Sequence, residues 1–250
     1  AKRLIHQLQW YAEEGVDSVM PAGDLGSSTA LLASPKILRD TVLAWWKEYV
    51  KAGRWKTAGS WWNAVDTHVP SPESLVRQTL YGNGFFRREI GAPSRDVFLP
   101  DCFGFGFALP SIAAHSGLTA FSTQKLTWGS AVPIPFHNLG RWVGPDGASV
   151  VAVLQPGSYT ATIGENLAND TDTLARINDS FAATGLYIDY RYFGTGDTGG
   201  SPTDSSVNWL QQSVITTNGL VNVLSAASDQ LFLDLAPSNV SRPRRAYQGL

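Results

Sequence analysis

The sequence predicts an α/β protein in which mostly parallel strands alternate with helices and curve into a barrel-like sheet. Three observations lead to this prediction. Short apolar runs alternate along the chain with segments of helical apolar spacing, and this alternation favours a parallel sheet or a barrel. The length of 250 residues suits one α/β barrel or one to two smaller domains. Hydrophobic residues make up 43% of the chain and charged residues 16%, which excludes a disordered chain.

The first two helices are predicted from Ser-Pro pairs, because Ser caps a helix well and Pro suits its first position. One helix is expected from Pro35, with Ser34 as its cap, to a glycine stop at Gly53. A second begins at Pro72. The elements that follow are expected in this order: a strand over 97–99, a helix over 108–115, a strand over 119–123, a hairpin over 141–154 around the turn 144–147, and a helix over 166–184.

The last third of the chain is expected to continue the alternation. A strand over 186–193 leads into a glycine-rich loop, and Ser201 with Pro202 caps the next helix. A short strand over 221–223 precedes a last helix that Ser228 caps. The chain opens without Met or a signal peptide, and both ends look like cuts in a longer polypeptide.

Charge and cysteine content narrow the classes of partner. Nineteen basic residues face 21 acidic ones, so the basic excess that nucleic-acid binding needs is missing. We see no apolar stretch of about 18 residues and therefore expect no membrane span. The single cysteine, Cys102, excludes an internal disulfide framework and a cysteine-rich zinc site.

Two aspartates stand at the carboxyl ends of predicted strands, where α/β folds place their active residues. Asp101 follows the strand 97–99, and Asp197 lies among glycines after the strand 186–193. Two carboxylates of this kind suit glycoside hydrolysis, in which one attacks the sugar and the other protonates the leaving oxygen. The alternative for each is a turn or helix-capping aspartate that binds backbone amides.

Other candidate residues have equally plain alternatives. Lys125, after the strand 119–123, would keep a nearby carboxylate ionised, and Trp128 would stack on a sugar ring. A solvated lysine and a core tryptophan are the alternatives. His115 lies in an apolar helix and is interpreted as structural.

The glycine-rich loop also matches a dinucleotide-binding fingerprint, because Gly194, Gly196 and Gly199 follow the G-x-G-x-x-G spacing. Asp197 places a negative charge inside the turn that would receive the pyrophosphate. Asp204 adds another at the start of the next helix, where phosphate would need a positive dipole. A nucleotide-dependent enzyme therefore stays the weaker hypothesis.

Six segments in one order resemble glycoside hydrolase family 38, the α-mannosidases. The resemblance runs from about Leu43 to the end of the chain, so residues 1–40 form a poorly matched leading segment and residues 41–250 a partial catalytic α/β domain. The segments are Ser71 to Gln78, Leu99 to Gly104, Leu109 to Ile112, Phe121 to Trp128, Gln155 to Tyr159 and Tyr192 to Gly200.

This resemblance implies a seven-stranded β/α barrel, incomplete in this chain, and a retaining, zinc-dependent hydrolase of terminal α-linked mannose. Asp101 would be the nucleophile and a zinc ligand, and Asp197 the general acid/base. Residues expected to contact the sugar in a mannose-containing oligosaccharide are Phe103, Lys125, Trp128, Asp66 and Tyr159.

The chain also departs from the family pattern. The first zinc motif, His-x-Asp, is missing, since His6 is followed by Leu8 where the aspartate would stand. A later zinc histidine belongs to a segment beyond Leu250. We therefore expect the remaining zinc ligands outside this chain and the isolated piece to be inactive. A carbohydrate-binding module without turnover is the alternative, and a homo-oligomer stays open.

Overall fold

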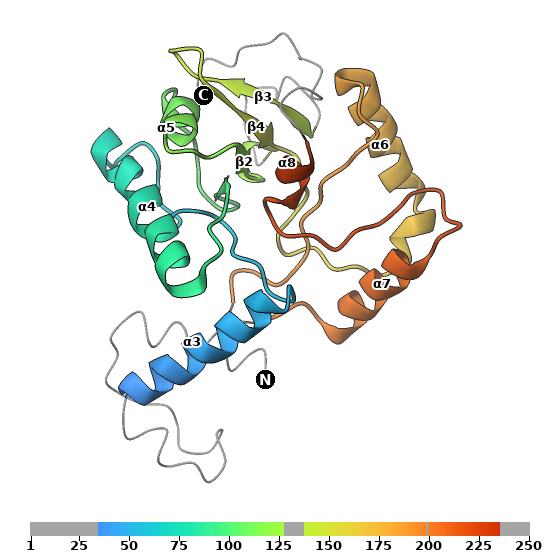
Figure 1. Ribbon diagram of the computed structural model, residues 1–250. Coiled ribbons are helices and arrows are strands. Elements are labelled where there is room, and N and C mark those ends of the chain that lie inside the picture. The colour runs from blue at the N-terminus through green and yellow to red at the C-terminus, as the bar shows by residue number, and fades with distance from the viewer. Residues whose placement is uncertain (1–34, 128–137, 199, 236–250) are drawn as a thin grey trace. The chain divides into compact units, whose positions relative to one another are not determined.

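The computed structural model describes residues 35–127, 138–198 and 200–235 (Figure 1). The chain divides into two compact units, one of residues 1–56 with 196–201 and a larger one of residues 57–195 with 202–250. Each unit is described by itself. In the smaller unit, helix α3 (Pro35–Lys51) confirms the helix expected there. Its Trp46 packs edge to face against Trp55, with ring centroids 6.3 Å apart.

Helix α4 (Pro72–Phe85) of the larger unit begins as the Ser-Pro pair predicts. The Ser71 hydroxyl accepts a hydrogen bond from the Ser74 amide at 3.2 Å, which satisfies one of the free N–H groups of the first turn. A π-helical turn (Phe86–Ile90) continues α4 and ends at Gly91, whose φ of 78° suits glycine. Helix α5 (Leu109–His115) also lies where the sequence predicts it.

Four strands form the sheet of the larger unit, in the order β1-β2-β4-β3. They are β1 (Asp96–Phe98), β2 (Ala120–Ser122), β3 (Leu139–Val143) and β4 (Ser149–Val153). The pairs β1–β2 and β2–β4 are parallel, and β3 runs antiparallel to β4 at the edge. The predicted hairpin is therefore confirmed, and so is a mostly parallel sheet.

The expected barrel is not seen. Over the described residues the sheet has four strands and stays open, with β1 and β3 at its edges. Two of the runs counted toward a barrel, 186–193 and 221–223, form no strand. These runs form hydrogen bonds outside the sheet instead: the Tyr192 amide donates to the carbonyl of Pro156 at 2.8 Å, in a loop, and the Val221 amide donates to that of Ala168 at 3.1 Å, in a 3₁₀ turn.

The helices of the last third are shorter than predicted or capped by other residues. A 3₁₀ turn (Leu167–Asn169) precedes α6 (Thr171–Thr184), so the helix expected from 166 begins with Asp170 as its cap. Helix α7 (Asp204–Ile215) is capped by Thr203 rather than Ser201, because the Thr203 hydroxyl accepts from the Ser206 amide. Helix α8 (Gln230–Asp234) follows Asp229, not Ser228.

Apolar side chains cover both faces of the sheet. On one face, Phe121 packs against Phe105 and Trp142, each with ring centroids 4.9 Å apart, and α5 adds Leu109 and Ala113. On the other face, the side chains of β2, β3 and β4 meet α8 and the extended segment after α6: Ala120, Leu139, Val153, Leu186, Ile188, Tyr190 and Phe232. The sheet is therefore the middle layer between α5 and α8 (Figure 1).

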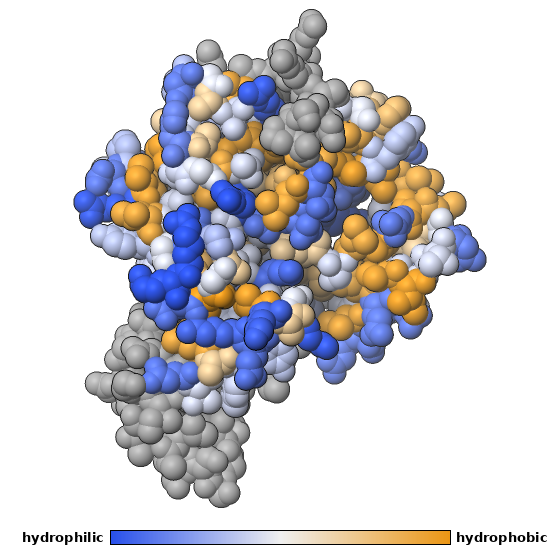
Figure 2. Space-filling model, viewed as in Figure 1, coloured by the Kyte–Doolittle hydropathy of each residue, from blue (hydrophilic) through white to orange (hydrophobic). Residues whose placement is uncertain are grey.

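Exposed apolar side chains gather over α7 and the segment that follows it (Figure 2). They are Val207, Trp209, Val214, Ile215, Leu220 and Leu224. None of the helices in the described parts of the chain is long and apolar enough to span a membrane.

Asp146, in the turn between β3 and β4, ties the hairpin to α5. Its carboxylate accepts hydrogen bonds from the Ser111 hydroxyl at 2.6 Å and the Ala148 amide at 3.0 Å, and it lies 2.6 Å from His115 Nε2. His115 thus makes a structural contact, as interpreted, although its side chain is 72% exposed rather than buried with the apolar residues of α5. The Ser111 bond first, and then the His115 bond, lower the pKa of Asp146 from 3.8 to about 2.

Helix α4 approaches the segment before β1 at a glycine. A Cβ at Gly82 would lie 2.2 Å from the Ser60 carbonyl oxygen and 2.7 Å from the Trp61 carbonyl carbon. The Ser60 amide in turn donates to the Asp96 carbonyl at 2.8 Å, so this backbone is fastened to β1. Two residues on, Gly84 has open space around its Cβ position.

We predict that Gly82→Ala and Gly84→Ala shift stability in opposite directions. The first forces α4 away from the Ser60 backbone and should cost about 1–3 kcal/mol. The second removes the glycine penalty in a helix and should gain up to about 1 kcal/mol. Urea unfolding followed by tryptophan fluorescence measures both. Equal effects of the two substitutions would contradict the close approach.

We also predict that Asp146 contributes to the free energy of unfolding and that this contribution depends on pH. Because the pKa of Asp146 is lowered in the folded state, this contribution is fully present above about pH 4. It is lost as the pH falls from about 4 toward about 2, where the folded carboxylate takes up its proton. The difference in urea midpoint between the wild type and Asp146→Asn should shrink across that window. A difference that stays constant between pH 5 and pH 2 would refute it.

Candidate active site

Three parallel strands bring their carboxyl ends to one edge of the sheet. Phe98 of β1 pairs with Ser122 of β2, which pairs with Val153 of β4. The ladder extends one residue further, since the Leu99 amide donates to the Ser122 carbonyl and the Thr123 amide to the Val153 carbonyl, both at 3.1 Å. The segments that leave this edge carry Asp101, Lys125 and Tyr159. Parallel pairing thus positions the candidate site.

The centre of the site is an ion pair. Lys125 Nζ lies 2.6 Å from Asp101 Oδ1, with 4% of the lysine side chain and 51% of the aspartate side chain exposed. A buried ammonium needs a counter-charge, and Asp101 supplies it. The carboxylate itself remains accessible to a ligand. The prediction that Lys125 lies near Asp101 is therefore confirmed by the geometry.

Two aromatic rings flank this ion pair. Lys125 Nζ lies 5.0 Å from the ring centroid of Phe103 and 5.6 Å from that of Tyr159, both within cation–π range. Phe103 is 67% exposed. An exposed aromatic beside a carboxylate offers an apolar face to the C–H face of a sugar ring. The structure therefore brings four of the predicted site residues together: Asp101, Phe103, Lys125 and Tyr159.

Sequence reasoning missed Gln124, which holds the backbone of Tyr159. Gln124 is 7% exposed, and its Oε1 accepts a hydrogen bond from the Tyr159 amide at 2.6 Å. The residue stands between Thr123 and Lys125, at the end of β2. A polar amide at the end of a buried strand was the available signal.

Asp66 lies in a loop that packs on the segment after Asp101. Its Oδ1 accepts from the His68 amide at 2.7 Å, so this carboxylate stabilises a turn. The neighbouring Thr67 hydroxyl donates to the Gly104 carbonyl at 3.1 Å. Burial, and then the charges of Asp101 and Asp66, raise the pKa of the Cys102 thiol. Both carboxylates thus lie close enough to act on Cys102.

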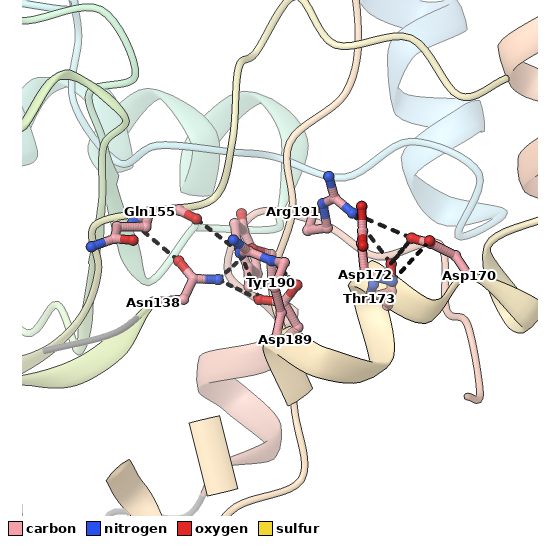
Figure 3. A network of polar contacts seen from close by, with 9 residues as sticks. Asn138, Gln155, Asp170, Asp172, Thr173, Asp189, Tyr190 and Arg191 are labelled. Carbon is pink, nitrogen blue, oxygen red and sulfur yellow. Dashed lines mark hydrogen bonds and ion pairs between the residues drawn. The ribbon is translucent and has the colours of Figure 1, made fainter. Parts of the chain in front are cut away.

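A polar network fixes the segments on either side of the Tyr159 loop (Figure 3). Asn138 Nδ2 donates to Asp189 Oδ1 and to the Tyr190 carbonyl, both at 2.6 Å. Arg176 binds the Asp189 carboxylate with two nitrogens, at 2.7 and 2.9 Å, and the Gln155 carbonyl at 2.9 Å. The network therefore connects the residue before β3, helix α6, the residue after Leu154 and the segment 189–190.

Asp197 lies in the smaller unit and is described by itself. Among the described residues it is the one non-glycine with a positive φ, 62°, a conformation that costs free energy but that aspartate tolerates. In the larger unit, two residues before this segment begins, the Gly194 amide donates to the Ala161 carbonyl at 2.9 Å. Trp128 lies outside the described residues.

The residues at hand do not by themselves form a zinc site. Within the described ranges no three His, Cys, Asp or Glu side chains cluster to hold a metal. Asp101 is the single predicted ligand among them, and its Oδ1 is bound by Lys125. Catalytic zinc needs three protein ligands, so the ion would require residues from elsewhere.

The structural context that a dinucleotide site needs is missing here. Residues 186–193, before the glycine-rich loop, form no strand. Helix α7 begins at Asp204, several residues after the loop, and Thr203 caps its first turn. The fingerprint requires a strand before the glycines and a helix that opens directly after them, so the match is one of spacing alone.

Comparison with known proteins identifies the family. Residues 36–248 match the glycosyl hydrolases family 38 N-terminal domain. The chain belongs to this family of glycosidases, as the six sequence segments predict.

Relatives of the chain carry the name alpha-mannosidase. Alpha-mannosidase G of Dictyostelium discoideum is 33% identical over 196 residues, which cover 76% of this chain and 17% of that protein. Human alpha-mannosidase 2C1 is 32% identical over 192 residues, or 74% of this chain and 17% of that protein. The chain thus spans about a sixth of the length of these relatives.

Solved structures show the same fold. An alpha-mannosidase from Enterococcus faecalis V583 superposes with a TM-score of 0.61 at 17% identity, over 99% of this chain and 28% of that one. A 4-alpha-glucanotransferase from Thermococcus litoralis gives a TM-score of 0.50 at 10% identity, over 85% of this chain and 32% of that one.

Proposed function

We propose that this chain forms the nucleophile half of a retaining α-mannosidase. The observation that carries the proposal is the half-exposed Asp101 carboxylate, paired with Lys125 at 2.6 Å and flanked by two aromatic rings. Membership in glycosyl hydrolases family 38 and the names of the relatives support the choice of mannose as the sugar.

The proposed reaction has two steps. In the first, Asp101 attacks the anomeric carbon of a terminal α-mannosyl residue, while Asp197 gives its proton to the departing oxygen. In the second, Asp197 takes a proton from water, and that water displaces Asp101 from the ester. The stereochemistry at the anomeric carbon is thus inverted twice and retained overall. The substrates proposed are mannose-containing glycans.

Lys125 supports the nucleophile in this scheme. Its ammonium stabilises the charge of the free Asp101 carboxylate by the ion pair at 2.6 Å. Phe103 and Tyr159 lie within cation–π range of the ammonium, at 5.0 and 5.6 Å, and are proposed to present apolar surface to the sugar. Asp66 is proposed as a further polar contact of the substrate, from the loop that packs beside Asp101 and Cys102.

Zinc is proposed as the metal of the complete protein, with Asp101 as one ligand and the others from outside the described residues. Ligand count supports this arrangement, since one carboxylate is too few for a catalytic zinc. The 250-residue chain alone should then retain little zinc and show little or no turnover. Stoichiometric zinc and full activity in the isolated chain would overturn it.

We predict that Asp101→Asn abolishes α-mannosidase turnover of the complete protein. The substitution removes the nucleophile, so the loss should be several orders of magnitude. Hydrolysis of an aryl α-mannoside measures it, with Asp179→Asn, an exposed position on α6, as the matched control. Near-normal turnover of the Asp101 variant would exclude the assignment. Sugar binding without turnover by the wild type would favour the binding-module alternative.

For Asp197→Ala we predict a loss that depends on the leaving group. General acid catalysis raises the rate about 10²–10⁴-fold and matters most for a basic leaving oxygen. The hydrolysis rate of alkyl mannosides should therefore fall far more than that of activated aryl mannosides. Azide should restore the second step, because this anion attacks the ester without base assistance. Equal losses on both substrates, with no azide rescue, would disprove the acid/base role.

A further inference from the structure

Tyr159 sits in a short loop that is fastened at both ends. The Pro156 carbonyl accepts from the Tyr192 amide at 2.8 Å, and the Ala161 carbonyl accepts from the Gly194 amide at 2.9 Å. Within the loop, the Ala161 amide donates to the Ser158 carbonyl at 3.0 Å. These bonds fix where the loop leaves and rejoins the fold. They do not act on the backbone of Tyr159 itself.

The middle of the loop is held by Gln124. The Gln124 side-chain oxygen accepts from the Tyr159 amide at 2.6 Å, and the next residue, Lys125, carries the ammonium that faces the Tyr159 ring at 5.6 Å. One short stretch of chain after β2 thus controls both the backbone and the ring of Tyr159. The Lys125 amide is itself held by the Thr123 hydroxyl at 3.3 Å.

We propose that Gln124 is a positioning residue for sugar binding. It sets the place of the Tyr159 ring beside the Lys125–Asp101 pair through its bond to the Tyr159 amide, without contact to the sugar. This inference rests on the proposed function, because it takes the Asp101 site as the sugar site. It adds a residue that the site assignment does not contain.

The expected consequence is a change in affinity. Gln124→Met keeps the length of the side chain and removes the acceptor, so the Tyr159 amide loses its partner and the ring its fixed position. Misplacement of a group in the site by about 1 Å can lower enzymatic activity by up to about 10²-fold. We expect KM to rise about tenfold, with kcat within about threefold of the wild type, since a contact made equally in ground and transition states affects KM.

A double-mutant cycle tests the inference in the complete protein. The variants are Gln124→Met, Tyr159→Ala and the combination, with aryl α-mannoside kinetics and the dissociation constant of methyl α-mannoside as readouts. Because Gln124 acts through Tyr159, its substitution should change neither readout by more than about twofold in the Tyr159→Ala background. An undiminished effect in that background overturns the proposal, as does an unaltered KM in the single variant.

Two further variants separate positioning from folding. Gln124→Glu keeps an acceptor at the same length and should lose less affinity than Gln124→Met. Gln211→Met makes the same chemical change on the exposed surface of α7 and should behave as the wild type. If the Gln124→Met protein does not fold, the Gln124→Glu and Gln124→Asn pair replaces it, and equal affinities of these two would refute the inference.

The two readouts also distinguish the inference from the proposed function. If the protein turns over mannosides but Gln124 and Tyr159 show no coupling, the proposed mannosidase function is kept and the positioning role is refuted. If the protein shows no turnover but the two substitutions have coupled effects on methyl α-mannoside binding, the positioning role is kept and the proposed reaction is refuted. A wild-type protein that neither binds nor hydrolyses mannosides refutes both.

Discussion

Parallel pairing of β1, β2 and β4 is the constraint on which the candidate site depends. Each strand is short, and the register from Phe98 through Ser122 to Val153 fixes which residues leave the sheet at the same edge. Because side chains alternate in a strand, a slip of one residue would exchange the faces. Phe121 would then leave the layer under α5, and Lys125 would no longer reach Asp101.

At the carboxyl edge of the sheet, the buried Lys125 ammonium is paired with the Asp101 carboxylate. A lysine side chain that is 4% exposed is costly unless a carboxylate meets it. The two rings at 5.0 and 5.6 Å lessen this cost by cation–π attraction. About half of the Asp101 side chain is exposed, so the pair combines a buried cation with an accessible anion. That combination is what the proposed role of Asp101 as a nucleophile requires.

The sequence predicted elements with local signals well and elements without them poorly. Helix α4 has its Ser71 cap and first-turn proline in the chain itself, and the hairpin has its glycine-rich turn. The run 186–193 alternates because Leu186, Ile188 and Tyr190 pack on the core, and such alternation is also typical of a strand. Periodicity reports burial, whereas a strand also needs a ladder partner, and that partner lies far away in sequence.

The same distinction holds for the site. Asp101 and Lys125 follow strands directly, so their positions were predictable once the strands were recognised. Gln124 was not, because the backbone amide that it binds lies 35 residues away and leaves no local pattern. The proposal that Phe103 and Tyr159 contact the sugar comes from the family resemblance, because spacing alone does not predict it. The seven-stranded barrel was expected from resemblance as well, and the described sheet is open.

The fastening of the loop 156–161 has a consequence for its evolution and redesign. Three bonds from outside the loop, to the Pro156 carbonyl, the Tyr159 amide and the Ala161 carbonyl, each belong to a fixed position in the chain. An inserted or deleted residue would put a different amide opposite Gln124. Side chains at Ser158 and Thr160, which are exposed and bind each other, are free to change. The loop therefore tolerates substitution at these two positions better than a change of its length.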